Sequence, residues 1–117
     1  MDKNLVRKVG KKLLILDKSI VFEENIAQFE VLTDKIIVML EIADKNANLK
    51  NIYAVSFDGK IIWQVQSEEE FNPNLKDVLP YENLFFTKGN LSASDFYGRN
   101  FTINIDTGLI ETMEITK

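Results

Sequence analysis

The sequence predicts an all-β fold of antiparallel meanders, and three observations lead to this class. The pair Asp58-Gly59 separates two β-rich runs, 51–57 and 60–65. An Asp-Gly pair between such runs is a strong hairpin signal, because a two-residue turn needs positive φ at both positions. A related turn, 106–108, places a second aspartate 48 residues after the first, about the length of one four-stranded propeller blade. The other apolar runs are short and separated by turn residues.

The N-terminal half is expected to form strands with almost no helix. The run 26–32 alternates apolar and polar side chains, which is the period of a half-buried strand. The run 35–42 is apolar on both faces, so we expect a central strand that is covered from both sides. The segment 43–50 is polar and predicts a loop. The strands expected before residue 67 are 11–16, 20–22, 26–32, 35–42 and the two arms of the hairpin 51–66.

The C-terminal half is predicted to begin with an irregular segment and to end in a meander. Pro73 and Pro80 permit at most a short helical turn within 67–80. The strands expected after it are 83–87, 91–96, 101–105 and 109–115. Four consecutive antiparallel strands joined by short turns have the geometry of one propeller blade.

The turn chemistry of the first hairpin predicts its register. A two-residue turn pairs Phe57 with Lys60 and Ala54 with Trp63. Both faces of this hairpin are then largely apolar, so we expect it to be packed from both sides. The aromatic residues of the hairpin are interpreted as core residues, with a ligand pocket as the alternative.

The second hairpin is expected to have one polar face. A three-residue loop with Gly108 in the left-handed region pairs Ile105 with Leu109 and Phe101 with Met113. One side of this hairpin is apolar and the other is largely polar, as in an outer layer that faces solvent.

These elements predict one domain, residues 1–117, with two blade-like units at about 20–66 and 83–115. Two units cannot close a propeller ring, which needs about four or more blades. We therefore expect two packed sheets, as a sandwich or a semi-open barrel, or completion by pairing between subunits.

Residues 51–65 resemble the blade repeat of the PQQ-like, quinoprotein-type β-propellers, in which a strand ending in an acidic-Gly turn leads into a strand that bears tryptophan. Residues 103–111 are similar to the same motif, although Glu111 stands where that strand would carry its tryptophan. The resemblance implies a blade-like fold and transfers no quinone or metal ligand. The whole chain is also similar to small bacterial all-β proteins of unknown function that carry this signature.

Composition excludes several kinds of chemistry. The chain has no histidine, which removes the usual general base and metal ligand. It has no cysteine, which excludes thiol nucleophiles, disulfides and zinc–thiolate sites. The net charge of −4 argues against nucleic acid as a partner. We expect no cofactor and no metal.

The first eighteen residues depart from this acidic character. They carry six cations, Lys3, Arg7, Lys8, Lys11, Lys12 and Lys18. We interpret them as solvated side chains that protect a sheet edge, with a polyanion site as the alternative. The run 13–16 is too short for a signal peptide or a membrane span, so a cytoplasmic location without membrane contact is predicted.

Candidate binding residues lie in two places. Phe71 and Tyr81 stand in the 67–81 stretch, and loops commonly carry recognition on rigid β scaffolds. Asp95, Tyr97 and Arg99 surround one turn and are predicted to form a polar recognition tip.

The carboxylates 68–70 are the strongest metal candidate, but adjacent loop carboxylates are usually solvated, and a calcium site needs oxygens at alternating positions.

Two hypotheses of function follow. The first is a non-catalytic protein-interaction module, including an immunity-type inhibitor, with self-association through open sheet edges as a compatible property. The second is a small-molecule binder or a carboxylate-based enzyme. An exposed aromatic patch would favour the first, and a deep pocket with converging carboxylates would favour the second. We favour the first, and therefore no enzymatic activity.

Overall fold

The computed structural model describes residues 2–44 and 48–115, so the middle of the predicted loop 43–50 lies outside the described residues. Within these ranges the chain is almost entirely β. Its elements are η1 (Lys3–Leu5), β1 (Val6–Val9), β2 (Lys12–Ile15), β3 (Lys18–Val21), β4 (Ile26–Val31), β5 (Ile36–Leu40), β6 (Ile52–Val55), β7 (Ile61–Gln64), α1 (Glu68–Phe71), β8 (Asn83–Thr87), β9 (Asn90–Ser94), β10 (Arg99–Ile103) and β11 (Ile110–Ile115).

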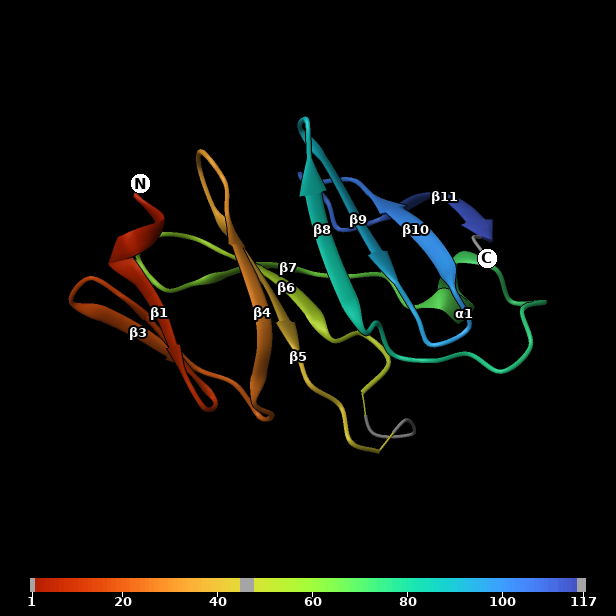
Figure 1. The fold of residues 1–117 in the computed structure, drawn as a ribbon, viewed down its shortest axis with the longest axis horizontal. Coiled ribbons are helices and arrows are strands. Elements are labelled where there is room, and N and C mark those ends of the chain that lie inside the picture. Colours follow the sequence, from red (N-terminus) through yellow and green to blue (C-terminus); the bar gives the residue numbers. More distant parts are fainter. Residues whose placement is uncertain (1, 45–47, 116–117) are drawn as a thin grey trace.

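The strands form three antiparallel sheets, each a meander in which strands consecutive in the chain are paired. We call β1–β2–β3 the N-terminal sheet, β4–β5–β6–β7 the middle sheet and β8–β9–β10–β11 the C-terminal sheet. Figure 1 shows the middle sheet between the other two. The all-β class of packed antiparallel meanders is thus confirmed, and the described strands close no barrel.

The N-terminal sheet goes beyond the sequence prediction, which contained no strand at 6–9. β1 pairs with β2, matching Val6 with Ile15 and Val9 with Lys12. Two adjacent cations in the middle of β1 interrupt its apolar pattern, which explains why no strand was predicted there. The N-terminal sheet covers the face of the middle sheet that points away from the C-terminal sheet (Figure 1).

β5 is the central, doubly covered strand that its sequence predicted. All five residues of Ile36–Leu40 are buried. Ile37 and Met39 belong to the core between the middle and C-terminal sheets. The other three face the core beneath the N-terminal sheet. Because successive side chains point to opposite faces, only an apolar run without alternation suits this position.

Trp63 joins the middle and C-terminal sheets. It lies opposite Ala54, as predicted, and is buried. Its indole Nε1 donates a 2.9 Å hydrogen bond to the carbonyl of Ile105, which also accepts from Lys35 Nζ at 3.1 Å. The interpretation of Trp63 as a core residue is confirmed.

The turn of the first hairpin differs from the predicted two-residue turn. Gly59 N–H donates to the Ser56 carbonyl at 3.0 Å, and Ser56 N–H donates to the Lys60 carbonyl at 2.8 Å. Ser56 therefore faces Lys60 across a three-residue loop, and only Gly59, not Asp58, has positive φ. The Ser56 hydroxyl accepts the Lys60 N–H and donates to the Asp58 carboxylate, which stabilises this longer loop. The predicted pair Phe57–Lys60 was wrong.

The second hairpin keeps the predicted pair Phe101–Met113. At its loop, however, Asn104 rather than Ile105 pairs with Leu109, through a 2.8 Å backbone hydrogen bond. The Asn104 side-chain oxygen accepts the N–H groups of the two loop residues 106 and 107, which fixes the longer loop. The predicted pair Ile105–Leu109 was wrong, and the Ile105 carbonyl is left to bind Trp63.

The segment 67–80 contains one helical turn, α1, as its prolines allow. Ser67 caps the turn, and its hydroxyl and the Glu70 carboxylate each accept a backbone N–H in a capping box. In the described part of the chain, no helix has the length and apolar character that crossing a membrane requires.

Candidate functional site

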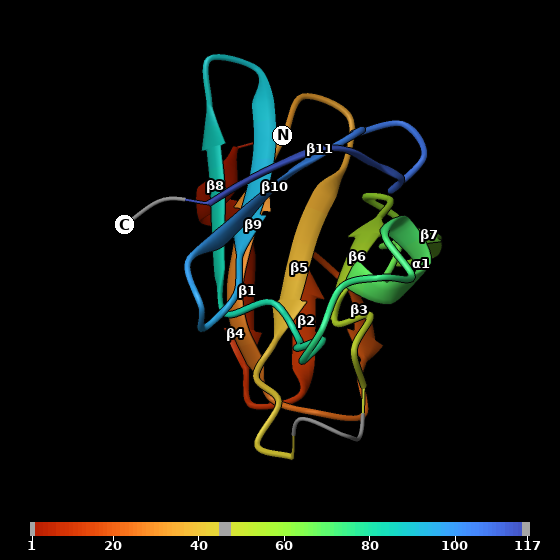
Figure 2. The same cartoon turned by 90° about the vertical axis from the view of Figure 1, so that its right-hand side faces the viewer.

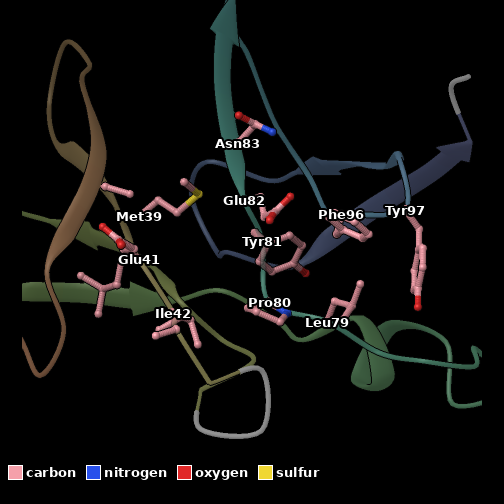
Figure 3. Close-up of a pocket in the computed structure, with 13 residues that line it drawn as sticks. Met39, Glu41, Ile42, Leu79, Pro80, Tyr81, Glu82, Asn83, Phe96 and Tyr97 are labelled. Atoms are coloured by element: carbon pink, nitrogen blue, oxygen red, sulfur yellow. The ribbon is translucent and has the colours of Figure 1, made fainter.

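A cleft of about 630 Å³ opens between the middle and C-terminal sheets. Its lining comes from β4, the end of β5 with the chain that follows it, the segment 79–83, and the β9–β10 turn. Figure 3 shows Met39, Glu41 and Ile42 on one side and Phe96 and Tyr97 on the other. The segment that leads into β8 lies between these two sides (Figures 2 and 3).

The charge in the lining of the cleft is negative. Glu41 and Glu82 are its only charged side chains among the described residues, and both are exposed. Figure 3 shows their carboxylates on different walls, not directed at one another. The cleft therefore presents a mixed polar and apolar surface with two separate carboxylates, rather than a carboxylate pair for acid–base chemistry.

Phe96 and Tyr97 form an exposed aromatic rim at the β9–β10 turn. They are 73% and 52% exposed, and their rings meet edge to face with centroids 5.8 Å apart. The guanidinium of Arg99 lies over the Tyr97 ring, 5.2 Å from its centroid, a cation–π contact that holds the ring in place. Two large aromatic side chains exposed together at a cleft make this rim a candidate binding surface.

Asn51 holds the base of the cleft together. Its side chain is fully buried, and its Nδ2 donates to the carbonyls of Leu40 and Tyr81 at 2.9 and 2.8 Å. Its Oδ1 accepts the Tyr81 N–H at 2.9 Å. One amide thus ties the end of β5 to the segment that enters β8, and it satisfies backbone groups that would otherwise be buried without partners.

A buried ionic network supports the other wall. Arg99 Nε donates to Asp95 Oδ2 at 2.7 Å, and Nη2 donates to Glu68 Oε1 at 3.2 Å. The same guanidinium donates to the carbonyls of Lys76 and Asp77 at 3.0 and 2.7 Å. The turn that carries the aromatic rim is therefore fixed to α1 and to the irregular segment after it.

Glu68 and Asp95 share Arg99 as a single cation, and the pKa values of the two carboxyl groups move in opposite directions. Burial, a hydrogen bond with Asp95 and repulsion from it raise the pKa of Glu68 to about 8, against the N–H of Leu79 and the charge of Arg99. Burial also raises the pKa of Asp95, but hydrogen bonds from Glu68 and Arg99 outweigh it and lower that pKa below its usual value. Near neutral pH, Glu68 thus holds a proton and Asp95 carries the charge that balances Arg99. Glu68 Oε2 is buried and accepts no hydrogen bond from the described residues.

Two of the predicted site residues are not where the sequence suggested. Asp95 and Arg99 are buried, so they do not form an exposed polar recognition tip. The expected solvation of the carboxylates 68–70 is also wrong for Glu68, which is fully buried. Each charged group is satisfied inside the protein: Asp95 by Arg99 four residues away, and Glu68 by Arg99 from a distant part of the chain.

The other predicted residues divide between core and cleft. Phe71 is half-buried and packs edge-on against Phe101, with ring centroids 6.3 Å apart. Tyr81 is buried, although it lines the cleft, and its hydroxyl donates to the Gln66 carbonyl at 2.8 Å. Of the five predicted residues, Tyr97 alone is exposed at the cleft.

Sequence reasoning missed several residues that build the cleft. They are Glu41, Asn51, Glu82 and Phe96. The adjacent aromatic pair in a tight turn was a usable signal for Phe96, since turns are normally polar. The others depend on contacts between sheets, which no local pattern reports. Across residues 2–44 and 48–115, no group of carboxylates is placed to hold a metal ion.

Comparisons with known proteins support the fold. A family model described as a domain of unknown function (DUF7957) matches residues 4–115. No curated protein matches the sequence. The crystal structure of the computationally designed Ika8 protein is similar, with a TM-score of 0.64, 8% sequence identity and 93% of this chain covered. The match spans 32% of the Ika8 chain, and at this identity it concerns the fold alone.

Proposed function

This chain belongs to the family described as a domain of unknown function (DUF7957), and we propose that it is a non-catalytic protein-interaction module whose partner binds at the cleft. The observation that carries the proposal is the exposed aromatic pair Phe96–Tyr97 beside a hollow lined by both apolar and polar groups. Aromatic side chains that become desolvated in such a hollow supply a large share of binding energy at protein interfaces.

The lining specifies the chemistry of the partner. Glu41 and Glu82 leave the cleft negative, so a fitting segment carries lysine or arginine beside apolar residues. A cation entering the cleft also finds the exposed ring of Phe96, where cation–π attraction is available, whereas Arg99 already lies over Tyr97. The proposal includes the inhibitory role of small bacterial immunity proteins in the cytoplasm, because an inhibitor needs a recognition surface and no catalytic group.

A small-molecule binder is the second candidate, and the volume of the cleft favours it. About 630 Å³ lies within the range of small-molecule sites. The rings of Phe96 and Tyr97 line the cleft but also stay largely exposed to solvent, which a protein partner explains better. The first proposal therefore accounts for more of the surface.

Capture of the partner with matched variants tests the proposal. Immobilised wild type is expected to retain a protein from a lysate of the source cells, and Phe96→Ser is expected to lose it. Phe85→Ser is the matched control, because Phe85 is 47% exposed on the outer face of β8, away from the cleft lining. Both substitutions remove largely exposed rings, so stability should change by no more than about 1 kcal/mol.

Two results would contradict the proposal. One is retention of the same partner by Phe96→Ser at undiminished yield. The other is absence of any captured protein, together with a metabolite fraction that raises the unfolding temperature of wild type but not of Phe96→Ser. The second result would instead establish the small-molecule binder.

A further inference from the structure

The N-terminal sheet has an outer face that no described segment covers. Residues directly opposite one another in antiparallel strands share a face, and Arg7, Leu14 and Ser19 form one such row. The opposite face carries Leu13 and Ile15, which are fully buried. We define the outer face by its two rows, which comprise Arg7, Val9, Lys12, Leu14, Ser19 and Val21.

This outer face has an apolar character that solvent exposure does not explain. Val9 and Val21 are 61% and 65% exposed and flank Lys12 in one row. At the opposite end of the stack, the outer row of the C-terminal sheet contains Ser92, Thr102 and Thr112 together with Phe85 of β8. Stacked β units normally end in a largely polar face. The outer face of the N-terminal sheet, at the left end of the stack in Figure 1, instead sets exposed valines beside cations.

The charge around the outer face is strongly positive. Arg7 and Lys12 lie on the outer face itself, whereas Lys8 and Lys18 belong to rows of the opposite face. All six cations of the first eighteen residues are exposed, and the first 22 residues contain only two acids, at positions 2 and 17. The whole chain has a net charge of −4, so this end opposes the rest of the molecule. A surface of this kind attracts acidic partners and steers their approach.

We propose that the outer face of the N-terminal sheet docks an acidic protein surface with an apolar centre, separately from the cleft. A symmetric contact with a second copy would set Arg7 and Lys12 against the same cations, which like-charge repulsion disfavours. Nucleic-acid phosphates would match the lysines but would leave Val9 and Val21 without apolar contact. An acidic protein surface satisfies both features.

Two polymer probes separate the charge from the apolar contribution. Poly-glutamate supplies carboxylates alone, and a random copolymer of glutamate and tyrosine adds apolar groups. By titration calorimetry, wild type is expected to bind the copolymer severalfold more tightly than poly-glutamate. Val9→Thr/Val21→Thr, which retains β-branched residues, should remove that difference. Arg7→Gln/Lys12→Gln should weaken binding of both probes, whereas the control Lys76→Gln/Lys88→Gln and the cleft variant Phe96→Ser should change neither.

Several outcomes would overturn the inference. Equal affinity for the two polymers in wild type would show that charge alone attracts them. Tighter binding of duplex DNA or of phosphatidylserine vesicles than of the copolymer would assign the face to a nucleic acid or a membrane. Sedimentation that reveals self-association lost in Val9→Thr/Val21→Thr would make a second copy the occupant. None of these results tests the proposed function of the cleft, because the cleft variant Phe96→Ser leaves the outer face of the N-terminal sheet unchanged.

Discussion

At the residue scale, the contact between Gly108 and Trp63 shows how one turn glycine supports the packing of two sheets. Gly108 has a φ of +78°, which side chains rarely adopt. A Cβ at this position would lie 2.5 Å from Cε3 of Trp63, well inside van der Waals contact. Two constraints therefore require glycine at position 108: the positive φ of its backbone, and the Trp63 indole that occupies the place of a Cβ.

Gly108→Ala is predicted to destabilise the protein more than Gly89→Ala. Gly89 has a φ of +80° and open space where a Cβ would be, so it isolates the backbone cost, about 1–2 kcal/mol. Overpacking against Trp63 should add about 1–3 kcal/mol at Gly108. Urea unfolding of the two variants measures the difference. Equal losses would show that the contact with Trp63 costs nothing.

The buried carboxyl pair leads to a prediction about pH. The raised pKa of Glu68 means that the folded chain holds a proton that the unfolded chain releases above about pH 4.5. Glu68 therefore makes its full contribution to the free energy of unfolding below pH 4.5, and this contribution falls as the pH rises to about 8. Each tenfold difference in proton affinity corresponds to about 1.4 kcal/mol. The lowered pKa of Asp95 acts at the acid end, where stability is lost as that group is protonated.

Glu68→Gln is predicted to flatten the fall in stability between pH 5 and 8 by more than about 1 kcal/mol. The glutamine amide can accept from Leu79 N–H and Arg99 and donate to Asp95, as the protonated acid does. Chemical unfolding at both pH values measures the effect, with the exposed neighbour Glu69→Gln as control. Equal destabilisation of Glu68→Gln at both pH values would mean that Glu68 is ionised throughout.

At the element scale, the end of β5 and the start of β8 depend on Asn51. Asn51→Ala is predicted to cost about 2–4 kcal/mol, because it leaves three buried backbone groups without partners. The Tyr81 amide should also lose protection from hydrogen exchange. Asn83→Ala, at an exposed cleft position, is the control and should stay within about 0.5 kcal/mol. An unchanged Tyr81 exchange rate in Asn51→Ala would refute the clamp.

The same scale shows what the sequence could and could not predict. Every predicted strand lies within two residues of an observed one, because alternation and turn residues are local signals. The hairpin loops were mispredicted where Ser56 and Asn104 bond to nearby backbone, a choice that competes with the simplest turn. The ionic network beside the cleft could not be predicted from the sequence, because Glu68 lies 27 residues from Asp95 and only packing brings them together.

At the scale of the whole molecule, the stack of three meanders creates two distinct surfaces. The cleft is negative and aromatic, and the outer face of the N-terminal sheet is positive and apolar. The resemblance to PQQ-like propeller blades stays a prediction, which the stacking of meanders suits without specifying a family. The two proposals together assign these surfaces of opposite charge to two different protein partners.

Amide hydrogen exchange of the complex with the captured partner tests the central claim, that binding takes place at the cleft. Slower exchange is predicted at residues 41–43, 79–83 and 96–97, with exchange in β10 and β11 of the C-terminal sheet unchanged. Protection confined to β10 and β11, or absent from the cleft while the partner remains bound, would contradict the account.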